Sequence, residues 1–431
     1  MTGLHHHSFI PRFPRVAAGT EETELSVETL SHAARYLYGR PPSADVVVLE
    51  SADALAPYRE QIDALAAAST DTNTQFESVT LAAAMENLAG GASVRVALLW
   101  SDPAAGGSRV LIGLVPYRVS RGFYGLPMPV WRVWEHIHSY ISTPLLRAGY
   151  EQLAVRRFLA LADRSGAALV QFPNFEAEGA FARALQEVVE QQHRVCRETD
   201  RHERAFLQSD LDENAYLAAH MRKKKRKEYN RLWNRLAETG DLKFETHDGG
   251  ADVNGWVRKF LRLEARGWKG KRGTAMNVRP NERAYFENIC AGAAREGKLH
   301  CSELTLDGKP LAMLASFRAG AGVYTFKIAF DESYSKYSPG ALLMMKAIGA
   351  FLGDGRTAWV DSCAIPNHPM IDHIWAQRRA MRSVLVSSGG PFSAQCVSYA
   401  AAIMRLADAA RSKLRVLYAR VRKEMDHDEA H

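Results

Sequence analysis

Three strand-like segments in direct succession constrain the fold of this chain more than any other feature. They occupy residues 299–306, 310–317 and 323–330, and the Asp307-Gly308 pair between the first two is typical of a tight hairpin turn. Helix and strand patterns surround them, in the order β-α-α-β-β-β-α-β-α-β. The other elements are expected at residues 242–246, 253–266, 282–296, 339–352, 357–363, 371–380 and 383–387. This order predicts an α/β (α+β) domain with a mixed, mostly antiparallel sheet that is flanked by helices.

The first half of the chain predicts a second mixed α/β region. Its strands are expected at residues 45–49, 94–100, 109–115 and 167–172, and its helices at 144–165 and 178–192. A faint repeat connects the halves, because Tyr140–Leu146 and Tyr337–Leu343 each place a proline and two leucines ahead of a helix and a strand. A duplicated fold explains this repeat. Chance is the alternative, since proline is common at helix starts.

The net charge of +7 comes from one short segment of the 431-residue chain. Six basic residues stand in a row from Arg222 to Lys227, and the window up to Arg235 holds eight basic residues against one acid, Glu228. The rest of the chain is neutral, which excludes a protein that is basic over its whole surface, as a histone-like protein is. A helix is expected over residues 212–239. Its basic run is either a solvated connecting surface or a contact for nucleic acid, an anionic lipid surface or an acidic polymer.

The composition is that of a folded globular protein, with 47% hydrophobic and 24% charged residues. No stretch approaches the roughly 18 apolar residues of a membrane-spanning helix, so no integral membrane association is expected. The five cysteines are scattered and lack a CxxC pair, which argues against a disulfide framework and against a metal site. Residues 1–15 lack the apolar core of a secretory signal. These features together predict a cytoplasmic protein with reduced thiols.

Five short motifs in the second half carry a family resemblance. They are Ala265–Gly270, Leu306–Ala312, Tyr324–Glu332, Tyr337–Gly340 and Trp359–Asp361. In this order and spacing they resemble the CelD/BcsL-like group of GNAT acyltransferases, which is associated with cellulose and exopolysaccharide synthesis. That group is similar to the FemAB/FemX aminoacyltransferases, which carry two tandem GNAT-like domains. The resemblance is strong over residues 215–390 and weaker over 45–205.

The resemblance implies two tandem GNAT-like domains and a C-terminal helix. The expected parts are a flexible lead-in (1–28), a degenerate GNAT-like domain (29–205), a basic connecting helix (206–240), a GNAT acyltransferase domain (241–390) and a C-terminal amphipathic helix (391–431). The implied donor is acetyl-CoA or another acyl-CoA, without a metal.

The implied coenzyme A site lies at the start of the helix expected at 339–352. A helix N-terminus suits a pyrophosphate because its first N–H groups are free and carry partial positive charge. The family's phosphate loop, (Gln/Arg)-x-x-Gly-x-(Gly/Ala), aligns with residues 337–342, where only Gly340 fits, so use of coenzyme A is itself open. The residues expected to bind the cofactor are Lys336, Tyr337, Ser338, Gly340 and Ala341. The simpler interpretation is an ordinary Ser cap followed by a proline at the first helical position.

Three side chains are candidates for the acyl-transfer chemistry. Lys327 and Asp331 are four residues apart, so both face one side if the strand at 323–330 runs on to Asp331. Asp331 would then act as general base or orient an amine, and Lys327 would stabilise the oxyanion or bind an acidic group. The alternative for this pair is an ion pair that holds the loop. Asp361 ends the next strand, where it either faces the ligand or caps a turn.

The acceptor substrate is expected near Trp268 and Lys269, in the loop between the first two helices of the second half. Trp268 would stack on a sugar ring or a base, and the alternative is a wedge that closes the core. His373 is a candidate acid or base because imidazole titrates near neutral pH.

Three functions follow from these patterns. The leading hypothesis is an acyltransferase that moves an acyl group from acyl-CoA to an amine or hydroxyl of a small molecule or glycan precursor, possibly for polysaccharide biosynthesis. The second is a FemX-like transferase that uses aminoacyl-tRNA, with the basic helix holding the RNA. The third is a non-catalytic GNAT-like scaffold subunit of a polysaccharide complex. The sequence does not reveal the oligomeric state.

Overall fold

The computed structural model describes residues 45–91, 93–103, 109–248, 250 and 252–428. The predicted lead-in at 1–28 and the start of the predicted first domain lie outside these residues. The boundaries expected at residues 205, 240 and 390 remain predictions.

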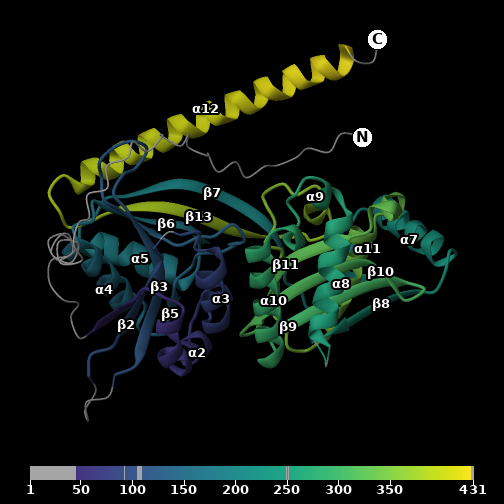
Figure 1. Ribbon diagram of the computed structural model, residues 1–431, viewed down its shortest axis with the longest axis horizontal. Helices are drawn as coiled ribbons and strands as arrows, with labels where there is room; N and C mark the ends of the chain where they lie inside the picture. Colours follow the sequence, from purple (N-terminus) through teal and green to yellow (C-terminus); the bar gives the residue numbers. More distant parts are fainter. Residues whose placement is uncertain (1–44, 92, 104–108, 249, 251, 429–431) are drawn as a thin grey trace, which may run out of the picture. The chain divides into compact units, whose positions relative to one another are not determined.

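Within the described residues, the strands join one continuous mixed sheet (Figure 1). Its order is β1-β2-β3-β4-β6-β13-β7-β12-β11-β10-β9-β8, and β5 pairs with β3 beside this path. The first-half strands are β1 (Val46–Leu49), β2 (Arg95–Trp100), β3 (Leu111–Ser120), β4 (Val130–Val133), β5 (Leu145–Leu146), β6 (Leu169–Glu176) and β7 (Cys196–Leu207). The second-half strands are β8 (Leu242–His247), β9 (Leu299–Leu306), β10 (Lys309–Ala319), β11 (Gly322–Phe330), β12 (Trp359–Asp361) and β13 (Gln377–Ser387).

The two halves repeat one topology. In the first half, β1 to β4 pair antiparallel in series, and β6 then joins β4 in parallel. In the second half, β8 to β11 pair antiparallel in series, and β12 joins β11 in parallel. This repeat agrees with the predicted fold class of two tandem GNAT-like halves with mostly antiparallel strands.

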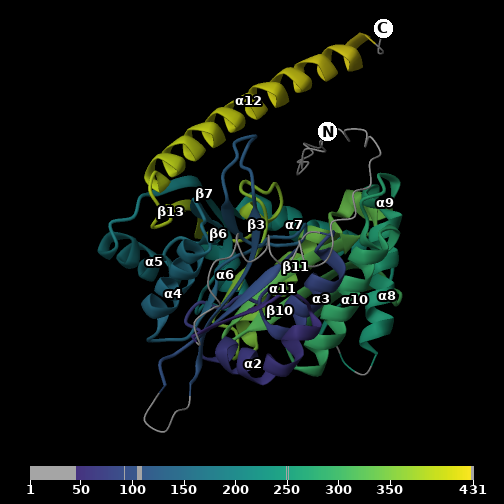
Figure 2. The same ribbon diagram turned by 60° about the vertical axis from the view of Figure 1, so that its left-hand side comes forward.

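The last strand of each half is exchanged. β7 comes from the first half but pairs with β12 of the second half, whereas β13 comes from the second half but pairs with β6 of the first. β7 and β13 also pair with each other, antiparallel, from Gln377↔Phe206 to Val386↔Cys196. The exchange turns two sheets into one (Figure 2).

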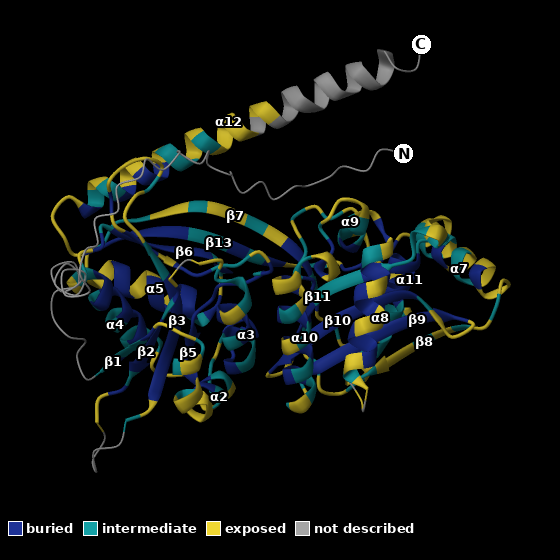
Figure 3. Ribbon diagram, viewed as in Figure 1, coloured by how far each residue is buried: buried dark blue, intermediate teal, exposed yellow. Residues whose placement is uncertain are grey.

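Helices cover both faces of this sheet. The first-half helices are α2 (Arg59–Ala67), α3 (Ser78–Leu88), α4 (Glu151–Arg164) and α5 (Ala180–Gln191), after the 3-10 turn η1 (Asp53–Tyr58). The second half holds α8 (Val253–Arg266), α9 (Trp268–Lys271), η2 (Met276–Val278), α10 (Pro280–Arg295), η3 (Glu332–Tyr337), α11 (Pro339–Gly353) and η4 (Ile371–His373). One core joins α8 and α10 to the first-half helices, and a second core packs α11 on the opposite face (Figure 3). The apolar faces of the strands meet helices on both sides, as an α/β layer structure requires.

The predicted hairpin between β9 and β10 is confirmed. Asp307 (φ 49°) and Gly308 (φ 73°) both adopt the left-handed conformation that this two-residue turn needs. The strands expected around residues 45–49, 94–100 and 109–115 are also present, as β1, β2 and β3.

The helix expected at 144–165 begins seven residues later than predicted. Leu145 and Leu146 instead form β5, which pairs with Leu114 and Gly113 of β3. Both leucines are buried, so their place in the sheet outweighs the helix-start signal of Pro144.

The single helix expected at 212–239 was wrong. The chain forms α6 (Glu213–His220) and α7 (Lys223–Ala237), separated by extended backbone at Met221 and Arg222, whose ψ angles are 132° and 134°. Met221 is buried with the α11 core, while Arg222 is exposed. The break lets the apolar side chains on both sides of the basic run reach one core.

The helix expected at 371–380 was also wrong. Only the short turn η4 forms there, and β13 begins at Gln377, six residues before the predicted strand. β7 was not predicted as a strand, because half of its residues are charged. α12 (Ser393–Asp428) confirms the predicted C-terminal helix, and its first turns pack on β13 and β7.

Candidate active site

The strand ladder opens between β11 and β12. These parallel strands pair only over Gly322↔Trp359, Val323↔Val360 and Tyr324↔Asp361, and β11 then continues to Phe330. Beyond this point the Thr325 hydroxyl donates to the Ser362 carbonyl at 2.6 Å. The edge of β11 that follows is therefore free of strand pairing with β12, and its peptide groups can bind a ligand.

The N-terminus of α11 lies beside the end of β11. A Cβ added at Gly340 would stand 3.4 Å from the Phe330 ring and 3.7 Å from Ile328, so the helix start faces the unpaired part of β11. Ser338 has a left-handed backbone (φ 53°, ψ 53°), and its carbonyl accepts from the amides of Ala341 and Leu342. Its hydroxyl makes no capping bond to the helix.

The other residues expected to bind the cofactor lie in the same turn. Lys336 is exposed and its ammonium stands 5.0 Å from the ring centre of Tyr337. Together with Ser338, Gly340 and Ala341 they line the junction of η3 and α11. The structure thus brings the predicted phosphate-binding residues together at one helix start.

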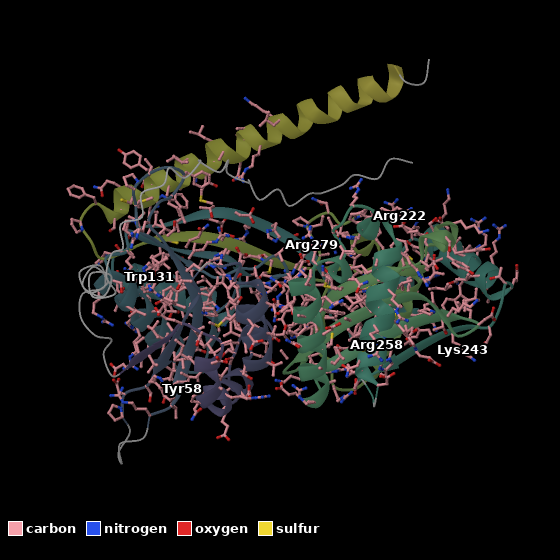
Figure 4. The ribbon with its side chains drawn as sticks, in the orientation of Figure 1. Tyr58, Trp131, Arg222, Lys243, Arg258 and Arg279 are labelled. Atoms are coloured by element: carbon pink, nitrogen blue, oxygen red, sulfur yellow. The ribbon has the colours of Figure 1, made fainter. Side chains whose placement is uncertain are left out.

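The basic helix α7 packs against η3. Its cations are mostly exposed, whereas Tyr229 and Leu236 on the same helix are buried. Figure 4 labels Arg222 just before the start of α7. The positive surface found in the sequence therefore adjoins the segment expected to bind phosphate, which the sequence alone did not predict.

A bulge in β11 directs Lys327 toward α8 and α10. Ala315 pairs with Lys327 and Ser316 pairs with Thr325, so Phe326 is an extra residue in the strand. Burial, followed by the nearby Lys269 ammonium, lowers the pKa of Lys327 to about 8, although the carboxylates of Glu264 and Glu282 act to raise it. Among the described residues, Lys327 has no ion-pair partner.

The neighbouring charges of this cluster are paired. Lys269 Nζ lies 3.0 Å from Glu264 Oε1, and Oε2 of the same carboxylate accepts from the Met276 amide at 2.9 Å. Arg279, labelled in Figure 4, lies 2.7 Å from Glu282 Oε1. Lys327 therefore stands as a cation without a paired acid in a site whose other charges are matched.

A loop from the first half completes this cluster. His138 is only 5% exposed, and its Nε2 lies 2.9 Å from Glu282 Oε2. The two atoms are within contact distance, although they do not form a well-aligned hydrogen bond. Its ring stacks on Tyr285 (5.8 Å, 8°) and meets Phe326 edge to face (6.0 Å). His138 was not among the predicted site residues, although two histidines two residues apart, His136 and His138, follow an aromatic loop.

Asp331 and Lys327 do not form the predicted pair. β11 ends at Phe330, and Asp331 instead caps η3, where its Oδ1 accepts from the amide and the hydroxyl of Ser333 at 2.9 and 2.6 Å. No contact between Lys327 and Asp331 occurs among the described residues, so the alternative of a mutual ion pair is also absent. The bulge and the end of the strand break the four-residue spacing on which the prediction depended.

Asp361 is completely buried in an ion-pair network. Its Oδ2 lies 2.6 Å from Arg204 and 3.0 Å from Arg379, and its Oδ1 accepts from the Cys363 amide at 2.8 Å. Burial alone would raise the pKa of Asp361, but the two guanidinium groups outweigh this and hold the pKa below its usual value. Arg379 also contacts Glu176 of β6, so the network spans both halves. Both oxygens of Asp361 are occupied by protein groups. No contact in the described residues therefore supports its predicted catalytic role.

The residues predicted to bind the acceptor do not lie together. Trp268 is 42% exposed, and its amide donates to Glu332 Oε1 at 2.5 Å, so it lies at the surface near η3. Lys269 belongs to the charged cluster around Lys327. His373 is exposed at the end of η4, and no described contact connects it to that cluster.

Among the described residues, no group of three or more His, Cys, Asp or Glu side chains could hold a metal ion. Likewise, none of the described helices has the length and apolar character needed to cross a membrane.

Comparisons with known proteins agree with this geometry. Residues 223–367 match the model of the acetyltransferase (GNAT) domain, while no curated protein matches the chain. FemX has 10% identity and a TM-score of 0.50, with 76% of this chain and 95% of FemX covered.

Two further structures score lower. A conserved protein of unknown function from Bacteroides thetaiotaomicron has 12% identity and a TM-score of 0.49, covering 77% of this chain and 97% of its own. A tandem GNAT protein from the clavulanic acid biosynthesis pathway has 12% identity and a TM-score of 0.38, with 80% and 99% covered. At these identities the likeness to FemX concerns the fold alone. The chain therefore contains a GNAT-type acetyltransferase domain, matched over residues 223–367, within a fold that it shares with FemX.

Proposed function

We propose that this protein is a GNAT-type acyltransferase that moves an acyl group from acyl-CoA to an amine or hydroxyl of a small molecule or glycan precursor. The observation that carries the proposal is the opening of the β11–β12 ladder directly beside the N-terminus of α11. One end of such a site binds phosphates at the helix start, and the other offers unpaired strand amides to the acyl carbonyl.

In this proposal the second half of the chain carries the acyl-transfer site. α11 begins without an acid in its first turn, whereas α4, at the corresponding place in the first half, carries Glu151 there. A carboxylate at a helix start competes with a bound phosphate for the same positive end. In the first half β5 also fills the position before the helix, so the first half is a degenerate copy.

The donor is held at the junction of η3 and α11. Ser338, Gly340 and Ala341 present the helix start to the pyrophosphate, while Lys336 and Tyr337 flank it. Gly340 allows close approach, because a Cβ there would point toward β11. Coenzyme A supplies the activated thioester, and the protein supplies the binding and the polarity.

Lys327 polarises the thioester carbonyl. With its pKa near 8 it is mostly protonated at pH 7, and its ammonium has no ion-pair partner among the described residues. A cation aimed at developing negative charge stabilises an oxyanion. Asp331 orients the acceptor from the start of η3, and Asp361 acts through Arg379 and Arg204 by fixing the strands around the opening.

The acceptor approaches over α9. Trp268 is 42% exposed and would stack on the acceptor through the part of its ring that the Arg272 guanidinium does not cover, and Lys269 belongs to the Lys327 cluster. His373 is a more distant candidate for the acceptor surface. The motif resemblance to the CelD/BcsL-like group supports a glycan or polysaccharide precursor as the acceptor, in a cytoplasmic enzyme.

An aminoacyl-tRNA-dependent transferase is the second candidate. The position of α7 against η3 favours it, because a run of exposed cations beside the donor site suits a polyanion longer than coenzyme A. A non-catalytic scaffold subunit is the third, and it predicts that neither donor binds.

Calorimetry separates these candidates. Acetyl-CoA and coenzyme A are titrated into the full chain, beside total tRNA at 50 and 200 mM salt. Micromolar binding of acetyl-CoA with weak tRNA binding supports the leading proposal. Tight tRNA binding that falls steeply with salt supports the second. Absence of acetyl-CoA binding at millimolar concentration contradicts the leading proposal.

A further inference from the structure

The cluster around Lys327 contains a histidine–carboxylate pair whose members come from different halves of the chain. His138 lies in the loop after β4, and Glu282 lies in the first turn of α10. Glu282 is fixed from its other side by Arg279, at 2.7 Å from Oε1, while Oε2 faces His138 Nε2 at 2.9 Å. Both side chains are at least nine-tenths buried.

This pair lies where the β11–β12 ladder has opened. The His138 ring contacts Phe326, the bulged residue of β11, which is two residues beyond the last β11–β12 pair. Lys327, the next residue, is close enough for its charge to act on the His138 imidazole. The acyl carbonyl of the proposed donor would lie at the same stretch of β11.

We propose that His138 is the catalytic base of the transfer reaction and that Glu282 positions its imidazole. This inference rests on the proposed function and deepens it, because it makes the first half a supplier of active-site chemistry. The pattern is that of a nucleophile-activating histidine held by a buried carboxylate.

The neutral amine or hydroxyl of the acceptor attacks the thioester carbon, a C–N or C–O bond forms, and the C–S bond breaks. The proton of the acceptor passes to Nδ1 of His138, because Nε2 faces the Glu282 carboxylate. Coenzyme A leaves as the thiolate, and the imidazolium gives this proton to it, so that the free thiol forms and His138 returns to its neutral form.

The surroundings keep the imidazole in the neutral form that a base requires. Burial lowers the pKa of His138 below 6.5, the Glu282 carboxylate raises it in part, the Lys327 ammonium lowers it, and Glu264 raises it slightly. His136 on the same loop accepts from the His138 amide, and the Tyr285 ring covers one face. Asp331, the base predicted from sequence, is instead engaged by Ser333.

The test compares His138→Gln with wild type in the full-length protein. We expect H138Q to bind acetyl-CoA as wild type does in calorimetry, and to lose about 10²-fold or more in transfer rate. The pH profile of kcat/KM should lose its acidic limb in H138Q. In Glu282→Gln that limb should move to lower pH, because a charge that favours the imidazolium has been removed.

Two matched variants control for loss of a buried imidazole and of an α10 carboxylate. His300→Gln removes a buried histidine of β9, and Glu287→Gln removes an exposed acid on α10; both should keep wild-type rates. If H138Q does not fold by far-UV circular dichroism, the E282Q profile and an NMR titration of the wild-type imidazole decide the question.

Three results would overturn the inference. One is an H138Q protein with wild-type rate and acidic limb, and another is an E282Q limb that does not move. In both cases the wild-type protein still binds acetyl-CoA and transfers the acyl group, so the proposed function is unaffected. The third is a wild-type protein that binds no acetyl-CoA, which overturns the proposed function together with this inference.

Discussion

Two buried ion pairs at Asp361 hold three strands together. Arg204 on β7, Asp361 on β12 and Arg379 on β13 are each less than a tenth exposed. The Asp361 carboxylate compensates the two buried guanidinium charges, because a buried charge without a partner lowers the stability of the fold. The network therefore stabilises the pairing of the exchanged strands, and we assign it this structural role rather than a catalytic one.

Asp361→Asn should lower the free energy of unfolding by about 3–5 kcal/mol, because it leaves two buried cations without their acid. Urea unfolding followed by circular dichroism measures this change. Asp241→Asn is the control, since its pair with Lys243 is exposed, and it should leave the urea midpoint unchanged. A D361N midpoint equal to that of wild type would show that the network contributes no stability.

Lys327 should affect stability in alkaline solution. Its pKa is about 8 in the folded protein against 10.5 ordinarily, so between these values the folded state binds fewer protons than the unfolded state. The contribution of Lys327 to the free energy of unfolding therefore rises with pH between about 8 and 10.5. Urea midpoints of wild type and Lys327→Met should diverge in favour of wild type as pH rises from about 8 to 10.5.

Lys298 supplies a control of opposite sign. Burial lowers its pKa, but Glu77 and Glu296 outweigh this and raise the pKa above 10.5. The stability that Lys298 contributes is present below 10.5 and is lost as pH rises through the raised value. The urea midpoint of Lys298→Met should therefore approach the wild-type midpoint at high pH. A K327M curve that runs parallel to wild type would contradict the lowered pKa of Lys327.

At the level of elements, the proposed donor site depends on the start of α11. In Gly340→Ala the new methyl meets Phe330 at 3.4 Å and Ile328 at 3.7 Å, which are ordinary contacts, so the fold should persist. The same methyl narrows the approach between α11 and β11. We expect acetyl-CoA affinity to fall about tenfold, or 1.4 kcal/mol, in calorimetry.

Gly353→Ala tests the same substitution at the other end of α11, where nothing lies within 4 Å of the added carbon. It should leave acetyl-CoA affinity at the wild-type value. Equal losses of affinity in both variants would mean that helix stability, rather than contact with the donor, explains the effect.

Strands with clear turns and apolar alternation could be predicted from sequence. The hairpin at Asp307-Gly308 and the order from β8 to β12 follow from local signals, since a two-residue turn and buried strands have strong local preferences. The helix start at Ser338, where we propose that phosphates bind, could be predicted for the same reason, because a proline and a glycine favour a helix start whatever the distant contacts of the chain.

Elements that depend on distant partners could not be predicted. Half of the residues of β7 are charged, and it forms a strand because β13 and β12 lie on its two sides. The break at Met221 serves a core built largely from α11, more than a hundred residues away. His138 contacts Glu282 only because the two halves of the chain meet, and a contact across 144 residues of sequence leaves no local signal.

For the whole molecule, the strand exchange predicts cooperative unfolding. A fragment of residues 45–207 would lack β13 beside β6, and a fragment of residues 208–428 would lack β7 beside β12. We expect neither fragment to show native near-UV circular dichroism when expressed alone. Each would expose a long sheet edge that the other fragment normally covers.

The full chain should then unfold in one urea transition. Tryptophan fluorescence and far-UV circular dichroism should give the same midpoint. Two separated transitions would show that the halves are independently stable and that the exchanged strands add little. A fragment that folds alone would contradict the prediction more directly.

The exchanged strands also bear on recombination between related genes. A crossover placed in the connecting segment before α7 joins β6 of one parent to β13 of another, because β13 begins at Gln377, 201 residues after β6 ends at Glu176. The Arg379–Glu176 contact and the β6–β13 register must then match across parents. Functional chimeras of this protein should therefore inherit β6, β7 and β13 from one parent, even when their active-site loops come from the other.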